Sequence, residues 1–183
     1  TADVTSAPVE AHFADLTRGA VDTRLWELLL DNGNGVLDAG DTLYRSVASQ
    51  AAPLVAIDRG GDFHVRLTVS GPAGAFELVK ATFIRTIEAR FAVAPDRGRA
   101  PLDVQLTDQS RGAITSWRWT FGDGSPAFET TDAALRSPLH AYATGGDFDV
   151  TLQVTGPAGT GARTVAGAVR TIKPSFTVAP IKG

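Results

Sequence analysis

The alternation of apolar and polar residues predicts β-strands along most of this chain. Trp117, Trp119 and Phe121 alternate with polar residues, and a Gly-Asp-Gly sequence that supplies turn chemistry follows them. A similar run begins at Trp26, continues with leucine at every second position, and is followed by Asp-Asn-Gly at residues 31–33. Each run predicts a strand that buries one face and ends in a turn.

The two runs belong to an internal repeat. Residues 60–74 and 145–159 both read Gly-Gly-Asp-Phe, then an alternating apolar strand, then Gly-Pro-Ala-Gly. A strand that ends in such a turn predicts one arm of a β-hairpin, with the returning arms over residues 75–87 and 161–172. Shorter strands at spacings of about 8 to 12 residues complete each repeat, which is typical of β-sandwiches. We therefore predict an all-β fold with two immunoglobulin-like sandwiches in tandem.

The repeat places one domain at residues 1–88 and a second at residues 89–173. The joint between them is short, which favours domains held in a rod. Residues 176–180, Phe-Thr-Val-Ala-Pro, copy the Phe-Ala-Val-Ala-Pro of residues 91–95, and the first repeat has no such segment. We expect residues 174–183 to be the first strand of a third repeat, in a molecule cut from a longer array. The alternative is a strand exchanged onto the open edge of a neighbouring molecule's first repeat.

Composition narrows the classes of function. The 183 residues include no cysteine and carry a formal net charge of −3. No apolar run approaches the ~20 residues that a membrane helix needs. A weakly acidic chain with scattered arginines offers no basic surface for nucleic acid. We therefore expect neither nucleic-acid binding nor membrane insertion. Residues 1–10 lack the pattern of a signal peptide, so a targeting segment is expected to lie outside this sequence or to have been removed.

The second repeat resembles a PKD (polycystic kidney disease) domain. The resemblance is carried by residues 114–124, by the His-x-Tyr at residues 140–142, and by the Gly-rich turn and alternating strand at residues 145–154. The first repeat is a degenerate copy, with Asp-Asn-Gly at residues 31–33 and Val-Ala at residues 55–56 in place of these motifs. The resemblance implies PKD-type, immunoglobulin-like sandwiches that serve as extracellular or cell-surface modules. Such modules are usually spacers or binding units and not catalysts.

The most suggestive run for a ligand is residues 31–41, which concentrates oxygen-bearing side chains and glycines. Calcium prefers six to eight oxygen ligands, and glycines let a backbone curl to deliver them. The run is similar to calcium loops of bacterial surface repeats with one residue deleted, and strict EF-hand spacing fails. A plain Asx-rich turn is the alternative. The candidate calcium ligands are Asp31, Asn34, the Val36 carbonyl, Asp38 and Asp41.

No catalytic apparatus is visible in the sequence. Asp123 is interpreted as a turn residue, and the three histidines lie too far apart in sequence to suggest a zinc site. Trp117 and Trp119 are candidates for a polysaccharide or collagen platform if they are exposed, but their alternation with polar residues favours the core. We therefore predict no enzyme activity.

The sequence leaves three functions open. The first is a non-enzymatic, stiff tandem-repeat spacer in a cell-surface or filamentous assembly, which makes protein-protein contacts with neighbouring repeats or copies. The second is an accessory module of a secreted hydrolase that binds polysaccharide or matrix protein. The third is a surface decoration protein of a virion or pilus. Apart from the predicted calcium, no cofactor is expected.

Overall fold

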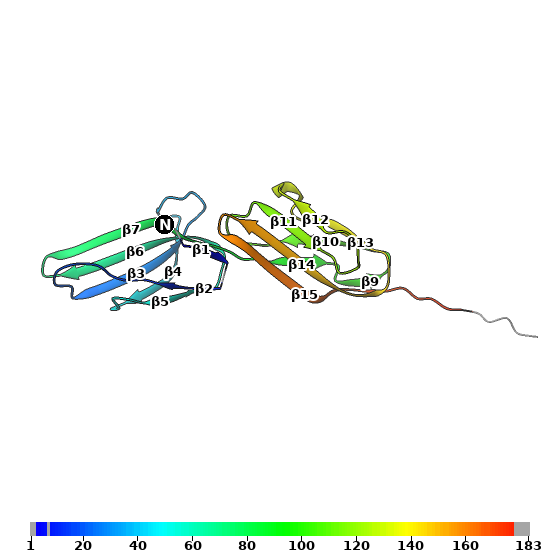
Figure 1. Ribbon diagram of the computed structural model, residues 1–183, viewed down its shortest axis with the longest axis horizontal. Coiled ribbons are helices and arrows are strands. Elements are labelled where there is room, and N and C mark those ends of the chain that lie inside the picture. The colour runs from blue at the N-terminus through cyan, green and yellow to red at the C-terminus, as the bar shows by residue number, and fades with distance from the viewer. Residues whose placement is uncertain (1–2, 7, 178–183) are drawn as a thin grey trace, which may run out of the picture. The chain divides into compact units, whose positions relative to one another are not determined.

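The computed structural model describes residues 3–6 and 8–177, and its regular structure consists almost entirely of strands (Figure 1). The elements of the first repeat are β1 (Asp3–Ser6), β2 (Val9–His12), β3 (Thr23–Leu30), β4 (Thr42–Ala48), β5 (Leu54–Ile57), β6 (Gly61–Gly71) and β7 (Gly74–Ile87). Those of the second are β8 (Phe91–Ala94), β9 (Arg97–Arg99), β10 (Leu102–Asp108), β11 (Ser116–Thr120), β12 (Phe128–Thr130), the 3-10 helix η1 (Ala133–Leu135), β13 (Leu139–Tyr142), β14 (Gly146–Gly156) and β15 (Gly159–Ile172). The first sandwich is defined here as β1 to β7 and the second as β8 to β15.

The chain divides into two compact units. The first unit comprises Thr1–Ala89 with the short segments Ser110–Thr115 and Val154–Gly161, and the second comprises Arg90–Gln109, Ser116–Gln153 and Ala162–Gly183. This division applies to the residues of these ranges that the structure describes.

The first sandwich has a five-stranded and a two-stranded sheet. The larger sheet runs β1-β7-β6-β3-β4, with β1 parallel to β7, and the smaller sheet pairs β2 with β5 antiparallel. Trp26 and Leu28 of β3 and Phe63 of β6 meet Val55 and Ile57 of β5 in one apolar core. The apolar residues of the predicted alternation therefore form the inward-facing side of these strands.

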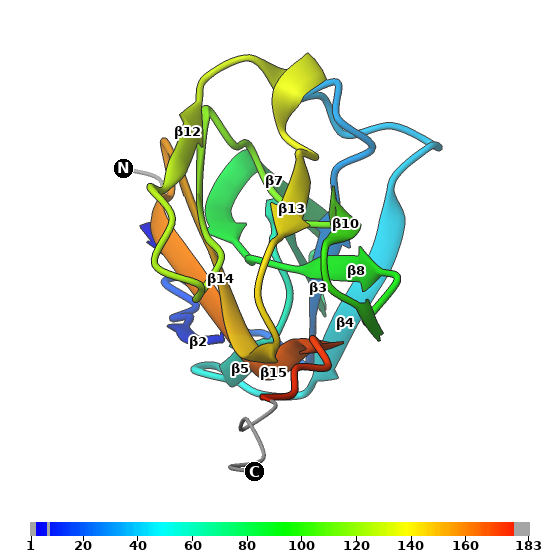
Figure 2. The ribbon, with the colours of Figure 1, turned by 90° about the vertical axis from the view of Figure 1, so that its right-hand side faces the viewer.

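The second sandwich has a five-stranded and a three-stranded sheet. The larger sheet runs β12-β11-β14-β15-β9, and the smaller sheet runs β13-β10-β8. Figure 2 shows β8, β10 and β13 following one another, in agreement with their antiparallel pairings. Strand β9 runs parallel to β15, as β1 does to β7. The two sandwiches therefore differ in one strand, because β8 has no counterpart among the described residues of the first.

The two tryptophans of β11 lie inside the second sandwich. Trp117 is 4% exposed and Trp119 is fully buried. The indole N–H of Trp117 donates to Asp108 Oδ2 at 2.9 Å, and that of Trp119 donates to the Arg136 carbonyl at 3.0 Å. Phe91 of β8 packs edge-on against Trp119 with ring centroids 5.3 Å apart. The alternative in which these rings form an exposed polysaccharide or collagen platform does not fit this burial.

Candidate functional site

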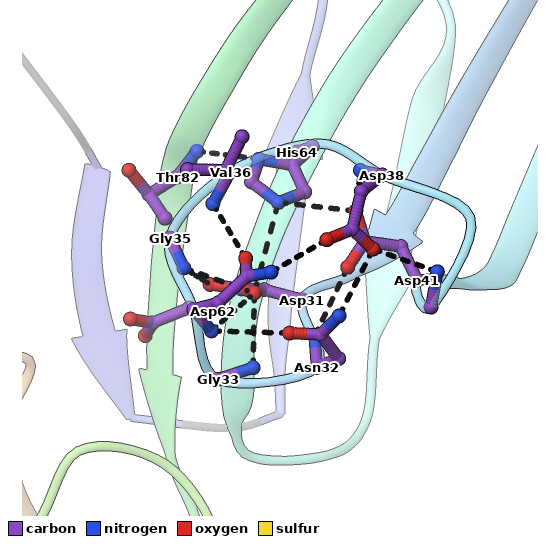
Figure 3. Close-up of polar contacts among 12 residues, drawn as sticks. Asp31, Asn32, Gly33, Gly35, Val36, Asp38, Asp41, Asp62, His64 and Thr82 are labelled. Carbon is purple, nitrogen blue, oxygen red and sulfur yellow. Dashed lines mark hydrogen bonds and ion pairs between the residues drawn. The ribbon is translucent and has the colours of Figure 1, made fainter.

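The loop of residues 31–41 connects β3 to β4 and is organised around the carboxylate of Asp31 (Figure 3). Asp31 Oδ1 accepts hydrogen bonds from the backbone N–H groups of Gly33 at 2.9 Å and Asn34 at 3.1 Å, and Oδ2 accepts one from Gly35 at 2.9 Å. Gly33 and Gly35 have φ values of 105° and 75°, in the left-handed region that glycine adopts without strain. The loop therefore curls its own amides around one acid.

The far side of the loop is held by two further acids. Asp38 Oδ1 accepts from the Gly40 N–H at 2.6 Å and from Asn32 Nδ2 at 3.0 Å, and Asp38 Oδ2 accepts from Asn34 Nδ2 at 2.6 Å. Asp41 accepts from the backbone N–H groups of Asp38 at 2.9 Å and Asn32 at 3.0 Å. The bond from Asp38 has the largest effect on the pKa of Asp41, which lies below its usual value although burial acts in the opposite direction.

His64 of β6 lies beneath this loop with its side chain fully buried. Its Nδ1 accepts a hydrogen bond from the Thr82 backbone N–H at 2.9 Å. Its Nε2 lies 3.4 Å from Asp41 Oδ2 and 3.9 Å from Asp31 Oδ1, without hydrogen-bond geometry to either oxygen. Because Nδ1 accepts a bond, a neutral ring carries its proton on Nε2. The imidazole therefore directs an N–H toward two carboxylates whose side chains are at most 3% exposed.

A bulge between β6 and β7 explains why His64 is placed there. Thr82 has a φ of 41°, and the pairing of β6 with β7 shifts register at this point, so the His64 ring takes up an N–H that the ladder leaves unpaired. The second sandwich has a similar contact 85 positions later, where Gly167 has a φ of 56° and its N–H donates to Asp149 Oδ1 at 2.7 Å. Unlike Asp149, His64 has a second ring nitrogen, and this nitrogen faces the loop at residues 31–41.

Asp62, two residues before His64 on β6, lies beside this cluster. Its Oδ1 is buried without a hydrogen-bond partner, and its Oδ2 lies 3.6 Å from Arg85 Nε. Burial raises the pKa of Asp62, and the nearby charge of Asp31 adds to the effect, which the guanidinium of Arg85 only partly offsets. The ionised form of Asp62 is therefore less favoured in the folded protein than in the unfolded chain.

The structure brings two of the predicted calcium ligands, Asp31 and Asp41, together with His64. One atom each of Asp31, Asp41 and His64 lies within 4.8 Å of the other two, and His64 was not among the predicted ligands. Asn34 and Asp38 bond to each other, and the N–H of Val36 donates to Asn34 Oδ1 at 2.8 Å. Side-chain oxygens of all four predicted side-chain ligands thus accept N–H bonds, which is the arrangement of Asx turns.

This geometry bears on the kind of metal that the cluster could hold. While Nδ1 of His64 accepts the Thr82 N–H, Nε2 is a donor and offers no lone pair to a cation. The carboxylates of Asp31 and Asp41 remain the oxygen donors that would face a hard cation. Calcium binding at the loop stays a prediction.

A second polar cluster ties the turn after β11 to β13. Asp123 Oδ2 lies 2.9 Å from His140 Nε2, and Asp123 Oδ1 accepts the Ser125 N–H at 3.0 Å. Burial acts to raise the pKa of Asp123, but these hydrogen bonds outweigh it and lower the pKa. The His140 ring stacks on the Phe121 ring, with ring centroids 3.7 Å apart. The Tyr142 hydroxyl donates to the Phe121 carbonyl, and burial raises the pKa of Tyr142 to about 12. Asp123 therefore acts as a turn residue that is locked by its neighbours.

The internal repeat carries a signal for His64. Position 64 aligns with Asp149, and both precede the same alternating apolar strand. The hydrogen bond between His64 and Thr82 depends on a bulge between β6 and β7, and a bulge depends on pairing between strands. Sequence spacing alone therefore could not assign the role.

Together these features define the class of protein. Sheets that pack over shared apolar cores, with the strand orders given above, make this an all-β protein with the immunoglobulin-like sandwich fold. More particularly, residues 86–171 match the PKD domain family. That match spans β8 to β14 and nearly all of β15, and it contains the motifs that carry the resemblance. Domains of this type are typically non-catalytic modules that are found outside cells.

Solved structures of several sandwich arrays are similar to this chain. The mouse nectin-like molecule 4 full ectodomain (Ig1–Ig3) is 14% identical with a TM-score of 0.37, over 96% of this chain and 67% of that one. The N-terminal four Ig domains of Dscam1 isoform 4.44 are 12% identical with a TM-score of 0.38, over 95% of this chain and 43% of that one. The fibronectin(III)-like modules of Clostridium thermocellum CbhA are 10% identical with a TM-score of 0.35, over 100% and 95%.

The comparison with curated proteins gave no match. Within the described part of the chain, no helix has both the length and the apolar character to cross a membrane.

Proposed function

We propose that this protein is a non-enzymatic extracellular structural module, in which β-sandwiches in tandem form a stiff spacer in a cell-surface or filamentous assembly. The observation that carries the proposal is the joint between the sandwiches. Strand β7 ends at Ile87 and β8 begins at Phe91, so three residues connect the last strand of one sandwich to the first strand of the next. A joint of this length leaves the chain little freedom to reorient.

The chemistry of the polar clusters supports a structural role. The acids of the loop at residues 31–41 accept hydrogen bonds from the loop's own amides, and Asp123 bonds to His140 and Ser125 within its own sandwich. Catalytic acids and bases need a pKa near the working pH and access to a substrate. The lowered pKa values of Asp41 and Asp123 do not suit either group to proton transfer near neutral pH.

The accessory-module alternative depends on aromatic rings exposed on a sheet face. Trp117 and Trp119 are buried, and the exposed large aromatic rings among the described residues are Phe76 and Phe176. These two phenylalanines do not share a sheet, because Phe76 belongs to β7 and Phe176 follows β15. The spacer proposal therefore has the stronger support.

Small-angle scattering tests the stiffness of the joint. The matched control is a variant with Gly-Gly-Gly-Gly-Ser inserted between Glu88 and Ala89, which makes the joint flexible. We expect the unmodified chain to give a narrow distribution of maximum dimensions and the insertion variant a broad one. An equally broad distribution for both chains would contradict the proposal.

A further inference from the structure

Among the described residues, four buried side-chain polar atoms lack a hydrogen-bond partner, and all four belong to the first sandwich. One is Nε2 of His64, which faces the loop at residues 31–41. The other three are Arg59 Nε, Asp62 Oδ1 and Arg85 Nε. A buried polar atom without a partner costs free energy, so three such atoms at one place indicate that they have a partner outside the chain.

The side chains that carry these three atoms line one cavity. It has a volume of about 760 Å³, and every residue of its lining belongs to the first compact unit. Asp62 of β6 and Arg85 of β7 lie opposite each other on neighbouring strands, so their side chains share one face of the sheet. Arg59 lies in the turn between β5 and β6, where its carbonyl accepts a hydrogen bond from the Thr86 hydroxyl at 2.7 Å. This bond holds the turn beside β7.

The second sandwich lacks this arrangement. At the offset of 85 residues that relates the two repeats, Thr144 takes the place of Arg59. Asp147 and Arg170 correspond to Asp62 and Arg85, and both are exposed. None of the buried unpartnered atoms among the described residues belongs to the second sandwich. The cavity with its three polar atoms is therefore a feature of the first sandwich, and the second supplies matched controls.

The three unpartnered atoms define the chemistry of the group that would satisfy them. A guanidinium group only donates hydrogen bonds, and an ionised carboxylate only accepts them. Asp62 Oδ2 lies 3.6 Å from Arg85 Nε, which leaves Oδ1 to accept from another donor. The partner must therefore accept two N–H bonds and donate one bond. Two arginines and one aspartate together carry one positive charge, so the partner is also an anion.

Few biological anions combine these properties. A carboxylate or a sulfate group carries no O–H at neutral pH. A neutral hydroxyl compound would exchange the same hydrogen bonds but would leave the positive charge without a counterion. A phosphate group that retains one proton has several oxygens that accept from arginine and one O–H that donates. A phosphate diester has no such O–H.

We propose that Arg59, Asp62 and Arg85 form a binding site for a protonated phosphate group, either inorganic phosphate or a phosphate monoester. Arg59 Nε and Arg85 Nε donate to phosphate oxygens, and the P–OH group donates to Asp62 Oδ1. A site with a buried acceptor for a ligand O–H rejects analogues that lack this group, so sulfate and phosphate diesters are excluded. The inference goes beyond the spacer function and does not depend on the stiffness of the joint.

Calorimetric titration of the full chain tests the site, with chelator present so that no cation at the loop of residues 31–41 bridges to the anion. At equal ionic strength, we expect inorganic phosphate to bind at least about tenfold more tightly than sulfate. Arg59→Gln and Arg85→Gln should each weaken phosphate binding at least about tenfold, because each removes a charged donor. Arg170→Gln is the matched control, because it makes the same change at the counterpart of Arg85, and it should leave binding unchanged.

Asp62→Asn tests the acceptor separately from the arginines. An amide N–H can donate to either anion, so we expect this variant to bind sulfate about as tightly as phosphate, within about twofold. The variant is expected to stabilise the fold at neutral pH, because burial disfavours the carboxylate, so misfolding does not obscure the result. Asp147→Asn, at the exposed counterpart, should keep the preference for phosphate.

Two phosphate esters separate the sources of the ligand. Glycerol 2-phosphate is a monoester, and dimethyl phosphate is a diester. Monoester binding as tight as that of inorganic phosphate assigns the site to a phosphorylated molecule, and tighter binding of inorganic phosphate assigns it to the free ion. The proposal is overturned if phosphate does not bind, if sulfate or the diester binds the unmodified chain as tightly as phosphate, or if Arg59→Gln and Arg170→Gln weaken binding equally.

Discussion

At position 64 and at its counterpart 149, the two sandwiches satisfy the same backbone group with different side chains. Asp149 accepts the Gly167 N–H in an exposed setting, whereas His64 accepts the Thr82 N–H in a buried one. The second nitrogen of His64 faces Asp31 and Asp41, so this ring also fills the space beneath the loop at residues 31–41 (Figure 3). A buried donor or acceptor that loses its partner costs more than an exposed one, which water can satisfy.

His64→Ala is expected to lower the free energy of unfolding by about 2 kcal/mol, because it leaves the Thr82 N–H and two acids without their neighbour. Asp149→Ala removes the equivalent acceptor where water can replace it, and is expected to cost less than about 0.5 kcal/mol. Urea unfolding of the two variants measures the difference. Equal costs would show that the second nitrogen of His64 contributes nothing.

Asp62→Asn is expected to stabilise the folded protein at neutral pH. The pKa of Asp62 is raised in the folded state by burial, so the folded protein binds its proton more tightly than the unfolded chain does, and ionisation above the unfolded pKa of about 3.9 opposes folding. The gain from Asp62→Asn should vanish as the pH falls below that value, where both states are protonated.

Urea midpoints of wild type and Asp62→Asn at pH 7 and pH 3 measure this change. Asp147→Asn is the matched control, because Asp147 is the exposed counterpart of Asp62 in the second sandwich. If Asp62→Asn stabilises equally at both pH values, burial of the charge is not the cause.

At the scale of the element, the loop between β3 and β4 differs from its counterpart in the second sandwich. Residues 31–41 form a closed set of side-chain to backbone bonds, whereas the equivalent turn after β11 is built on Asp123 and its contact with His140. The first turn is held from below by His64, and the second is held by the imidazole of His140 on β13, which belongs to the other sheet. The same strand framework therefore supports two different turn chemistries.

Calcium binding belongs to this loop and is tested by thermal unfolding. A cation that binds only the folded loop raises the melting temperature by mass action. We expect a higher melting temperature in calcium than in chelator, and we expect the Asp31→Asn variant to lose that difference. Asp123→Asn, in the other sandwich, should keep the difference. Equal melting temperatures in calcium and in chelator would contradict the prediction of calcium binding.

At the scale of the whole molecule, each sandwich has its own buried core. Leu28 and Leu106 are central in the first and second cores, at 1% and 0% exposed. Truncating either leucine to alanine is expected to destabilise its own sandwich by about 2 to 5 kcal/mol. The chain has three tryptophans, of which only Trp26 lies in the first sandwich, so fluorescence can separate the two cores.

In a Trp26→Phe background, fluorescence reports the second sandwich alone. We expect Leu106→Ala to lower the urea midpoint in this background and Leu28→Ala to leave it in place, while circular dichroism shows that Leu28→Ala has lost structure in the first sandwich. A midpoint that moves equally with both substitutions would mean that the chain unfolds as one cooperative unit.

Much of the fold could be predicted from the sequence by itself. The alternation around Trp26 and Trp117 gives the direction of each side chain, because successive residues of a strand face opposite sides wherever that strand is placed. The repeat gives the equivalence of β2 with β10, and the motifs of the second repeat give the PKD match at residues 86–171. These are local properties of the sequence, so they can be predicted without knowing which strands pair.

Only the tertiary structure decided which strands and side chains meet. The alternation left open whether Trp117 and Trp119 faced a core or a ligand, until the packing of both sheets buried them. His64 meets Asp31 and Asp41 because a bulge between β6 and β7 turns its ring beneath the loop, and Arg97 of β9 lies opposite Arg170 of β15 because these two strands pair in parallel. Strand pairing joins residues far apart in sequence, so neither feature can be read from spacing along the chain.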